Sequence, residues 1–170
     1  SKNSLTYTEI ILGLPGDSKE SHFSSLRYGI ENGVDNIRMY QAILLYGTDM
    51  ATQKTRKEFQ IKSKFRVIPG SIGNYTFGGE NVMVADIEEI IIATKDLSFE
   101  DYISCRVMNL IIETFINNSP FEEVFSVMNK LRISTFEIME ELHKNEEYYP
   151  EKVKQIFNSF VHMTKDDLYD

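Results

Sequence analysis

The stretch that decides the fold runs from Leu5 to Gly16 and reads LTYTEIILGLPG. Its first eight residues are rich in β-branched and aromatic side chains, which favour a β-strand. The glycines and the proline that follow them predict a turn. We therefore expect a strand over residues 5–12 that ends in a tight turn beginning at Gly13.

A helix and a second strand are expected directly after this turn. Asp17 is suited to the N-cap of the helix, with Glu20 completing a capping box, and Gly33 stands where a helix commonly ends. Residues 36–41 (NIRMYQ) have the composition of another strand. Together these elements predict a βαβ unit with parallel strands, in which the Gly-Leu-Pro-Gly turn lies at the edge that usually carries ligands.

The middle of the chain has a weaker pattern. We expect Thr48 to cap a short polar helix that reaches about Phe59, and residues 64–68 to form a short strand. The prolines and glycines of residues 69–79 predict a turn-rich stretch. Residues 82–94 are predicted to hold one or two further strands.

The composition changes near residue 97, beyond which the sequence predicts helices. Ser98 and Ser134 are suited to N-caps, and Pro150 to the first position of a last helix. We therefore expect two parts, an α/β part over residues 1–97 and a helical region over residues 98–170.

Charge and cysteine content narrow the classes of function. The formal net charge is −8 and there is no basic cluster, so neither nucleic acid nor an anionic membrane surface is an expected partner. No apolar run approaches the roughly 20 residues that a membrane-spanning helix needs. Cys105 is the single cysteine, which excludes an internal disulfide and a cysteine-only metal site, and a reducing, cytoplasmic location fits. The sequence starts with Ser1 and enters a predicted strand almost at once. We therefore expect that the chain is an excised domain and that Ser1 is left over from cloning.

Glu9 is the strongest candidate for a functional side chain. A carboxylate inside an apolar strand costs free energy unless it has partners. Side chains alternate along a strand, so Glu9 shares a face with Ile11. One interpretation is an ordinary surface ion pair; the other is a carboxylate that accepts hydrogen bonds from ligand hydroxyl groups or an amine.

The segment EIILGLPG (9–16), together with residues 33–41 (GVDNIRMYQ) and 44–48 (LLYGT), resembles the fifth and sixth strands of a radical S-adenosylmethionine (SAM) barrel. Residues 66–102 resemble, more weakly, the tails of members that carry a cobalamin-binding domain upstream. The resemblance implies an α/β fold made of a partial parallel (βα) barrel segment followed by an all-helical C-terminal region.

The resemblance also implies roles for individual residues. Glu9 matches the acidic residue that points toward the ribose or amino-acid part of SAM. Ile11 and Gly13 match the apolar residue and the glycine that pack beside the adenine, and Tyr40 would line the substrate side. In this family a [4Fe-4S] cluster, bound by a Cys-x3-Cys-x2-Cys loop, cleaves SAM reductively to a 5′-deoxyadenosyl radical.

The chain departs from the family because this cysteine motif is missing, and one thiolate cannot hold a cubane cluster. We therefore expect no catalytic residue, metal ligand or bound cofactor in this chain. The cluster, SAM and a candidate cobalamin would belong to a longer parent protein with an unknown small-molecule substrate. The expected partners are the missing N-terminal half and, through exposed strand edges, a second copy. Two alternatives stay open: a non-catalytic interaction domain with a degenerate βαβ half, and an unrelated α/β binding domain.

Overall fold

The computed structural model describes residues 5–170, and the expected origin of Ser1 lies outside this range. The chain begins with strand β1 (Tyr7–Leu12), helix α1 (Lys19–Glu31) and strand β2 (Asn36–Gln41), and the two strands pair in parallel. This arrangement confirms the predicted βαβ unit. The helix is capped by Ser18 instead of Asp17, because Ser18 and Ser21 bond reciprocally to each other's backbone N–H.

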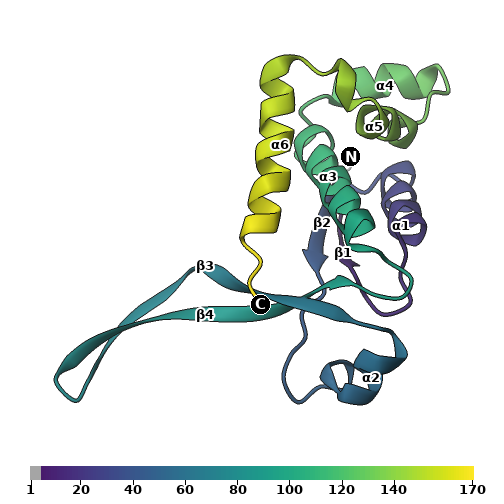
Figure 1. Ribbon diagram of the computed structural model, residues 1–170. Helices are drawn as coiled ribbons and strands as arrows, with labels where there is room; N and C mark the ends of the chain where they lie inside the picture. Colours follow the sequence, from purple (N-terminus) through teal and green to yellow (C-terminus); the bar gives the residue numbers. More distant parts are fainter. Residues whose placement is uncertain (1–4) are drawn as a thin grey trace.

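The middle of the chain is dominated by a long hairpin. A 3-10 turn, η1 (Asp49–Ala51), and the short helix α2 (Gln53–Glu58), which is capped by Thr52 and not by Thr48, lead into strand β3 (Lys62–Phe77). Strand β4 (Glu80–Ala93) returns antiparallel to β3, and the hairpin projects away from the helices (Figure 1).

The strand predicted over residues 64–68 is therefore present but much longer than expected, and the prediction of a turn-rich stretch over residues 69–79 was wrong up to Phe77. The pairing of β3 with β4 is irregular between Val67 and Ile72, the segment that contains Pro69 and Gly70. A bulge of this kind lets a strand continue past residues that fit a regular ladder badly. The reversal itself lies at Gly78-Gly79, whose φ angles of 61° and 87° suit a two-residue hairpin turn.

The C-terminal part is helical, as predicted. It consists of α3 (Phe99–Phe115), α4 (Glu122–Lys130), α5 (Thr135–Lys144), the 3-10 turn η2 (Glu146–Tyr148) and α6 (Glu151–Asp166). Ser98 and Ser134 are confirmed as N-caps, since each side chain accepts a hydrogen bond from the backbone N–H three residues later. Pro150 is the N-cap of α6 and not its first helical residue.

The α/β class and the helical C-terminal region are thus confirmed, but residues 5–170 form no barrel. The β1–β2 sheet has two parallel strands, and the next strands are joined as an antiparallel hairpin. A parallel strand would need a crossover connection after β2. The tight turn at Gly78-Gly79 instead sends β4 back along β3.

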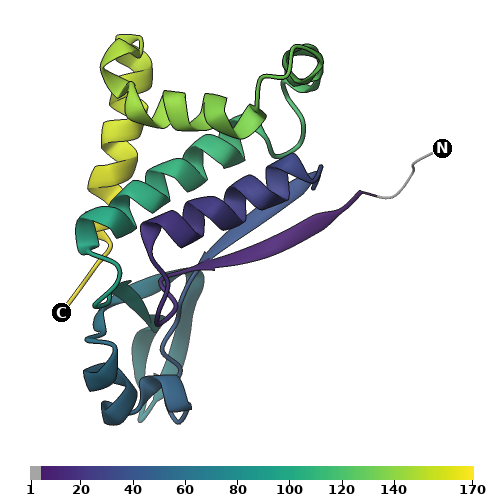
Figure 2. The ribbon, with the colours of Figure 1, turned by 90° about the vertical axis from the view of Figure 1, so that its right-hand side faces the viewer.

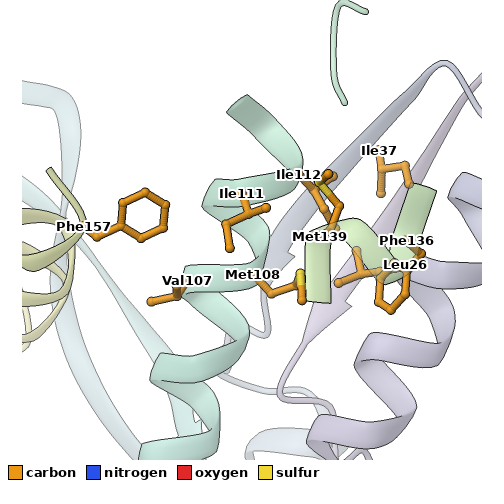
Figure 3. Packing of buried hydrophobic residues seen from close by; sticks show 9 residues of the cluster. All are labelled: Leu26, Ile37, Val107, Met108, Ile111, Ile112, Phe136, Met139 and Phe157. Carbon is orange, nitrogen blue, oxygen red and sulfur yellow. The ribbon is translucent and has the colours of Figure 1, made fainter. Parts of the chain in front are cut away.

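Of the three buried clusters of residues 5–170, the two larger ones pack the helices against the strands. The larger one joins side chains from α1, β2, α3, α5 and α6, with Met108 and Ile112 of α3 near its centre (Figure 3). The second joins β1 and β4 to α3 through Leu12, Ile90 and Tyr102. Both of these clusters combine residues from before and after residue 97. The division of the chain into two parts at that position stays a prediction.

Candidate functional site

The β1–β2 sheet has one covered face and one open face. Helices α1 and α3 lie on the same side of the sheet (Figure 2), where Ile37 is buried and Ile10 and Met39 pack against the larger cluster. On the other face Ile11 is 43% exposed and Tyr40 is 46% exposed. The alternation of side chains along both strands produces this division.

Glu9 lies on the open face beside Arg38, its partner in the parallel register. Ile11 and Tyr40 form the next pair along the same face. The face therefore presents a carboxylate, a guanidinium group, an aliphatic side chain and a phenol at neighbouring places. Arg38 was missed at the sequence level, although the same alternation that pairs Glu9 with Ile11 puts Arg38 on the face of Tyr40.

The carboxylate of Glu9 makes no hydrogen bond or ion pair with any residue from 5 to 170. It can accept hydrogen bonds from a ligand hydroxyl group or amine without first losing an internal partner. This open carboxylate is therefore a candidate acceptor for a ligand on the open face.

Gly13 lies apart from the other three predicted site residues. It is buried at the end of β1 with a φ of 90°, and a Cβ there would approach the carbonyl oxygen of Ile91 to 3.4 Å. A larger residue would be strained at this φ. Glycine at this place thus lets β1 end against β4, while Glu9, Ile11 and Tyr40 share the open face.

The outer edge of β2 is closed at Ile37 by a side chain. The buried side chain of Asn117 accepts a hydrogen bond from the backbone N–H of Ile37 and donates one to its carbonyl, both at 2.9 Å. Beyond the end of β2, Ile43 forms an antiparallel bridge with Ile90 of β4, on the edge that β1 occupies up to Leu12. No local sequence pattern indicates this role of Asn117, because its partner lies 80 residues away.

The outer edge of β1 is open. The backbone N–H groups of Asn36 and Ala42 donate to the carbonyl oxygens of Thr6 and Leu12. The even-numbered residues of β1 therefore turn their backbone groups toward β2. By the regular alternation of a parallel ladder, Tyr7, Glu9 and Ile11 turn their backbone groups the other way. No strand of residues 5–170 pairs with that edge. An added strand could therefore extend the sheet at β1, whereas at β2 it would have to displace Asn117.

The residues present do not fit an iron–sulfur cluster. Cys105 is fully buried, and this burial raises the pKa of its thiol to about 12, which keeps it protonated. Within the described part of the chain, no group of three or more His, Cys, Asp or Glu side chains is arranged to hold a metal ion. None of the described helices is long and apolar enough to cross a membrane.

Comparison with known proteins does not assign the chain to a family. The sequence matches no protein-family model, and a search of curated proteins finds no significant match.

Proposed function

We propose that this chain is the C-terminal part of a radical SAM-type enzyme, in which the open face of the β1–β2 sheet forms part of the inner wall around SAM and substrate. The observation that carries the proposal is the open face itself. In a βα barrel the helices cover the outside of each strand and the other face turns inward. The β1–β2 sheet has this division, with Glu9 on the uncovered face.

The edges of the sheet support the same proposal. Asn117 closes the outer edge of β2 at Ile37, whereas the outer edge of β1 offers unpaired backbone groups. Exposed edges of this kind favour pairing with another strand. In the proposed parent protein, the preceding strand of the barrel would pair with β1, and the N-terminal half would complete the cavity.

Each predicted site residue has a role in this proposal. Glu9 accepts hydrogen bonds from the ribose hydroxyls or the amino group of SAM, and Ile11 packs against the adenine. Gly13 ends the strand so that the turn approaches the adenine closely. Tyr40, beside Ile11 on the open face, lines the substrate side.

This chain does not supply the catalytic cluster. Its one thiol is buried and protonated, so the [4Fe-4S] cluster that cleaves SAM in this family would be held by the N-terminal half. Cobalamin remains a candidate second cofactor of the parent, and a reducing cytoplasmic compartment the proposed location. The chain alone is a scaffold with ligand contacts, not an enzyme.

The coding sequence before Ser1 tests the family assignment. An in-frame Cys-x3-Cys-x2-Cys motif upstream would support it, and a start codon directly before Lys2 would contradict it. A titration of the isolated chain with SAM, followed by NMR, tests the incomplete site. We expect binding weaker than millimolar, and tight binding by the chain alone would contradict the proposal.

The role of Glu9 is tested in a polypeptide that also contains the N-terminal half. Glu9→Gln keeps the shape of the side chain but removes its charge, and we expect SAM to bind at least about tenfold more weakly, as for loss of a charge-assisted hydrogen bond. Glu80→Gln is the matched control, because Glu80 is exposed at the turn of the hairpin. Equal SAM affinity of the two variants would exclude a ligand role for Glu9.

A second candidate function is non-catalytic association through the hairpin. Beyond its irregular segment the hairpin exposes several large apolar side chains: Ile72, Tyr75, Phe77, Val82, Met83 and Val84. Apolar patches of this kind mark interaction surfaces. We propose a second copy as the occupant, joined through the free strand edges of the hairpin.

Light scattering over a concentration series tests this association. Glu80 and Asp86 give each copy negative charge along the hairpin, so the dimer should strengthen as salt rises. Met83→Lys should produce a monomer at all concentrations. A monomeric unaltered chain at high concentration and high salt would contradict this function.

A further inference from the structure

A small cavity lies at the carboxyl end of β2, between α3, α6 and the base of the hairpin. It has a volume of about 130 Å³, and its polar lining residues are Gln41, Arg66, Tyr102, Arg106, Thr164 and the exposed Asp167. This is several times the roughly 30 Å³ that one water molecule occupies in the liquid. The cavity can hold a compact ion but not a nucleotide.

Arg106 contributes an unmatched positive charge to this cavity. Its Nε atom is buried and has no hydrogen-bond partner, and no carboxylate of residues 5–170 forms an ion pair with it. Its guanidinium group lies over the ring of Phe160, with 5.3 Å to the ring centroid. Buried polar groups without partners are uncommon in folded proteins, and each calls for an explanation.

The neighbouring carboxylates of residues 5–170 form no ion pair with Arg106, and this includes Asp167, which is exposed at the same cavity. Arg66 donates from Nε to Glu88 at 2.7 Å and from Nη1 to Gln41 at 2.5 Å, so the Glu88 carboxylate is already engaged. Burial lowers the pKa of Arg106, Tyr102 acts in the opposite direction, and the like charge of Arg66 lowers the pKa further. An arginine starts from so high a pKa that it keeps its charge.

We propose that this cavity binds a compact oxyanion, such as phosphate or a small carboxylate, with Arg106 as its principal ligand. The planar guanidinium group donates to two oxygens of such an ion at once. Tyr102 is buried at the cavity wall, and its hydroxyl group provides a further donor. The bound ion would satisfy the Nε group and neutralise the charge that the protein leaves unmatched.

Thermal unfolding with inorganic phosphate and with acetate, each at an ionic strength matched with chloride, tests the proposal. We expect at least one of the two ions to raise the unfolding temperature in a saturable way, and the ion that does so identifies the class of oxyanion. Adenosine monophosphate should give no such shift, since the cavity is too small for it. Absence of a saturable shift with both phosphate and acetate would overturn the proposal.

Variants separate an anion site from a purely structural arginine. Arg106→Met keeps much of the side-chain volume, and replacing a buried charge by an apolar group is often tolerated by the fold. We expect it to weaken binding of the effective ion by at least about tenfold. Arg132→Gln is the matched control, because Arg132 is exposed and should leave binding unchanged.

Two further measurements complete the test. Tyr102→Phe should weaken binding a few-fold without loss of the fold. The NMR signal of the Arg106 Nε–H group should shift on addition of the ion and reach a plateau at the same concentration as the thermal shift. Equal binding by the unaltered chain and Arg106→Met would place the ion elsewhere and refute the assignment.

Discussion

The side-chain amide of Asn117 forms two hydrogen bonds with the backbone of Ile37, accepting from its N–H and donating to its carbonyl. It thereby takes the place that a third strand would occupy beside β2. Both residues are buried, so neither backbone group can turn to water instead. This contact connects the end of α3 to the parallel sheet.

Asn117→Ala should destabilise the protein strongly. The change leaves the buried N–H and carbonyl of Ile37 without partners, at a cost of about 2–4 kcal/mol in the free energy of unfolding. Urea unfolding followed by circular dichroism measures this loss. Asn118→Gly is the control, because Asn118 is exposed with a φ of 62°, and its effect should stay within about 0.5 kcal/mol. Similar stabilities of the two variants would show that the Asn117 contact contributes little.

Glu89 should stabilise the base of the hairpin through its contacts with Arg56 and Ser63. Arg56 donates to both carboxylate oxygens at 2.7 and 2.8 Å, and Ser63 donates a third hydrogen bond at 2.5 Å. The bonds from Arg56 lower the pKa of Glu89 below its ordinary value of 4.5. Glu89→Gln should therefore cost about 1.5–3 kcal/mol near neutral pH, as expected for hydrogen bonds to a charged group.

The pH dependence of this cost follows from linkage. A carboxyl group with a lowered pKa stabilises the fold above about pH 4.5, and this contribution is lost as the pH falls through the lower value of the folded state. The stability difference between the unaltered chain and Glu89→Gln should thus shrink on going from about pH 7 to about pH 3. Asp170→Asn is the control, because the exposed pair of Lys64 and Asp170 should contribute little. A pH-independent difference for Glu89 would contradict the prediction.

Local signals in the sequence were sufficient for the βαβ unit and the C-terminal helices. Ser98 and Ser134 were recognisable as caps, because a cap and its partner are only three residues apart. The predicted N-cap of α1, Asp17, was one residue too early. Asp and Ser are both favoured at N-caps, so the sequence alone does not distinguish Asp17 from Ser18.

The hairpin and the edges of the sheet depend on long-range contacts that no local pattern contains. Pro69 and Gly70 are typical of turns, yet the pairing of β3 with β4 on both sides carries the strand past them. Asn117 meets Ile37 across 80 residues of sequence. The unmatched charge of Arg106 likewise becomes visible only once α3, α6 and β3 surround it. The open face of Glu9, in contrast, followed from alternation along one strand.

His22 should make the protein sensitive to mild acid. It is buried, its Nε2 lies 2.9 Å from Oδ1 of Asn109, and its Nδ1 has no partner. Burial lowers its pKa below the ordinary 6.5, although Asn109 and Asp17 act in the opposite direction. The unfolded chain therefore binds a proton below pH 6.5 that the folded chain resists, and stability falls as the pH decreases from that value.

A double variant tests the contribution of His22. His22→Leu combined with Asn109→Leu removes both polar partners, and the slope of unfolding free energy against pH between about 6.5 and 5 should decrease by up to about 1.4 kcal/mol per pH unit. The lowered pKa of His143, which is also caused mainly by burial, leaves a residual slope. Asn109→Leu alone should retain the acid sensitivity of the unaltered chain. Identical slopes for all three proteins would exclude His22 as a source.

Cys105 should be chemically inert as long as the protein is folded. Only the thiolate attacks disulfide reagents or binds iron, and burial raises the pKa of this thiol to about 12 while also blocking access to it. An aromatic disulfide reagent should therefore leave the native chain unmodified for hours and react with one thiol per chain in concentrated guanidinium. Ser24→Cys, on the exposed side of α1, is the matched control and should react at once with one of its two thiols. Rapid modification of the native, unaltered chain would mean that α3 opens readily around Cys105 and that this thiol is accessible enough to help hold a cluster.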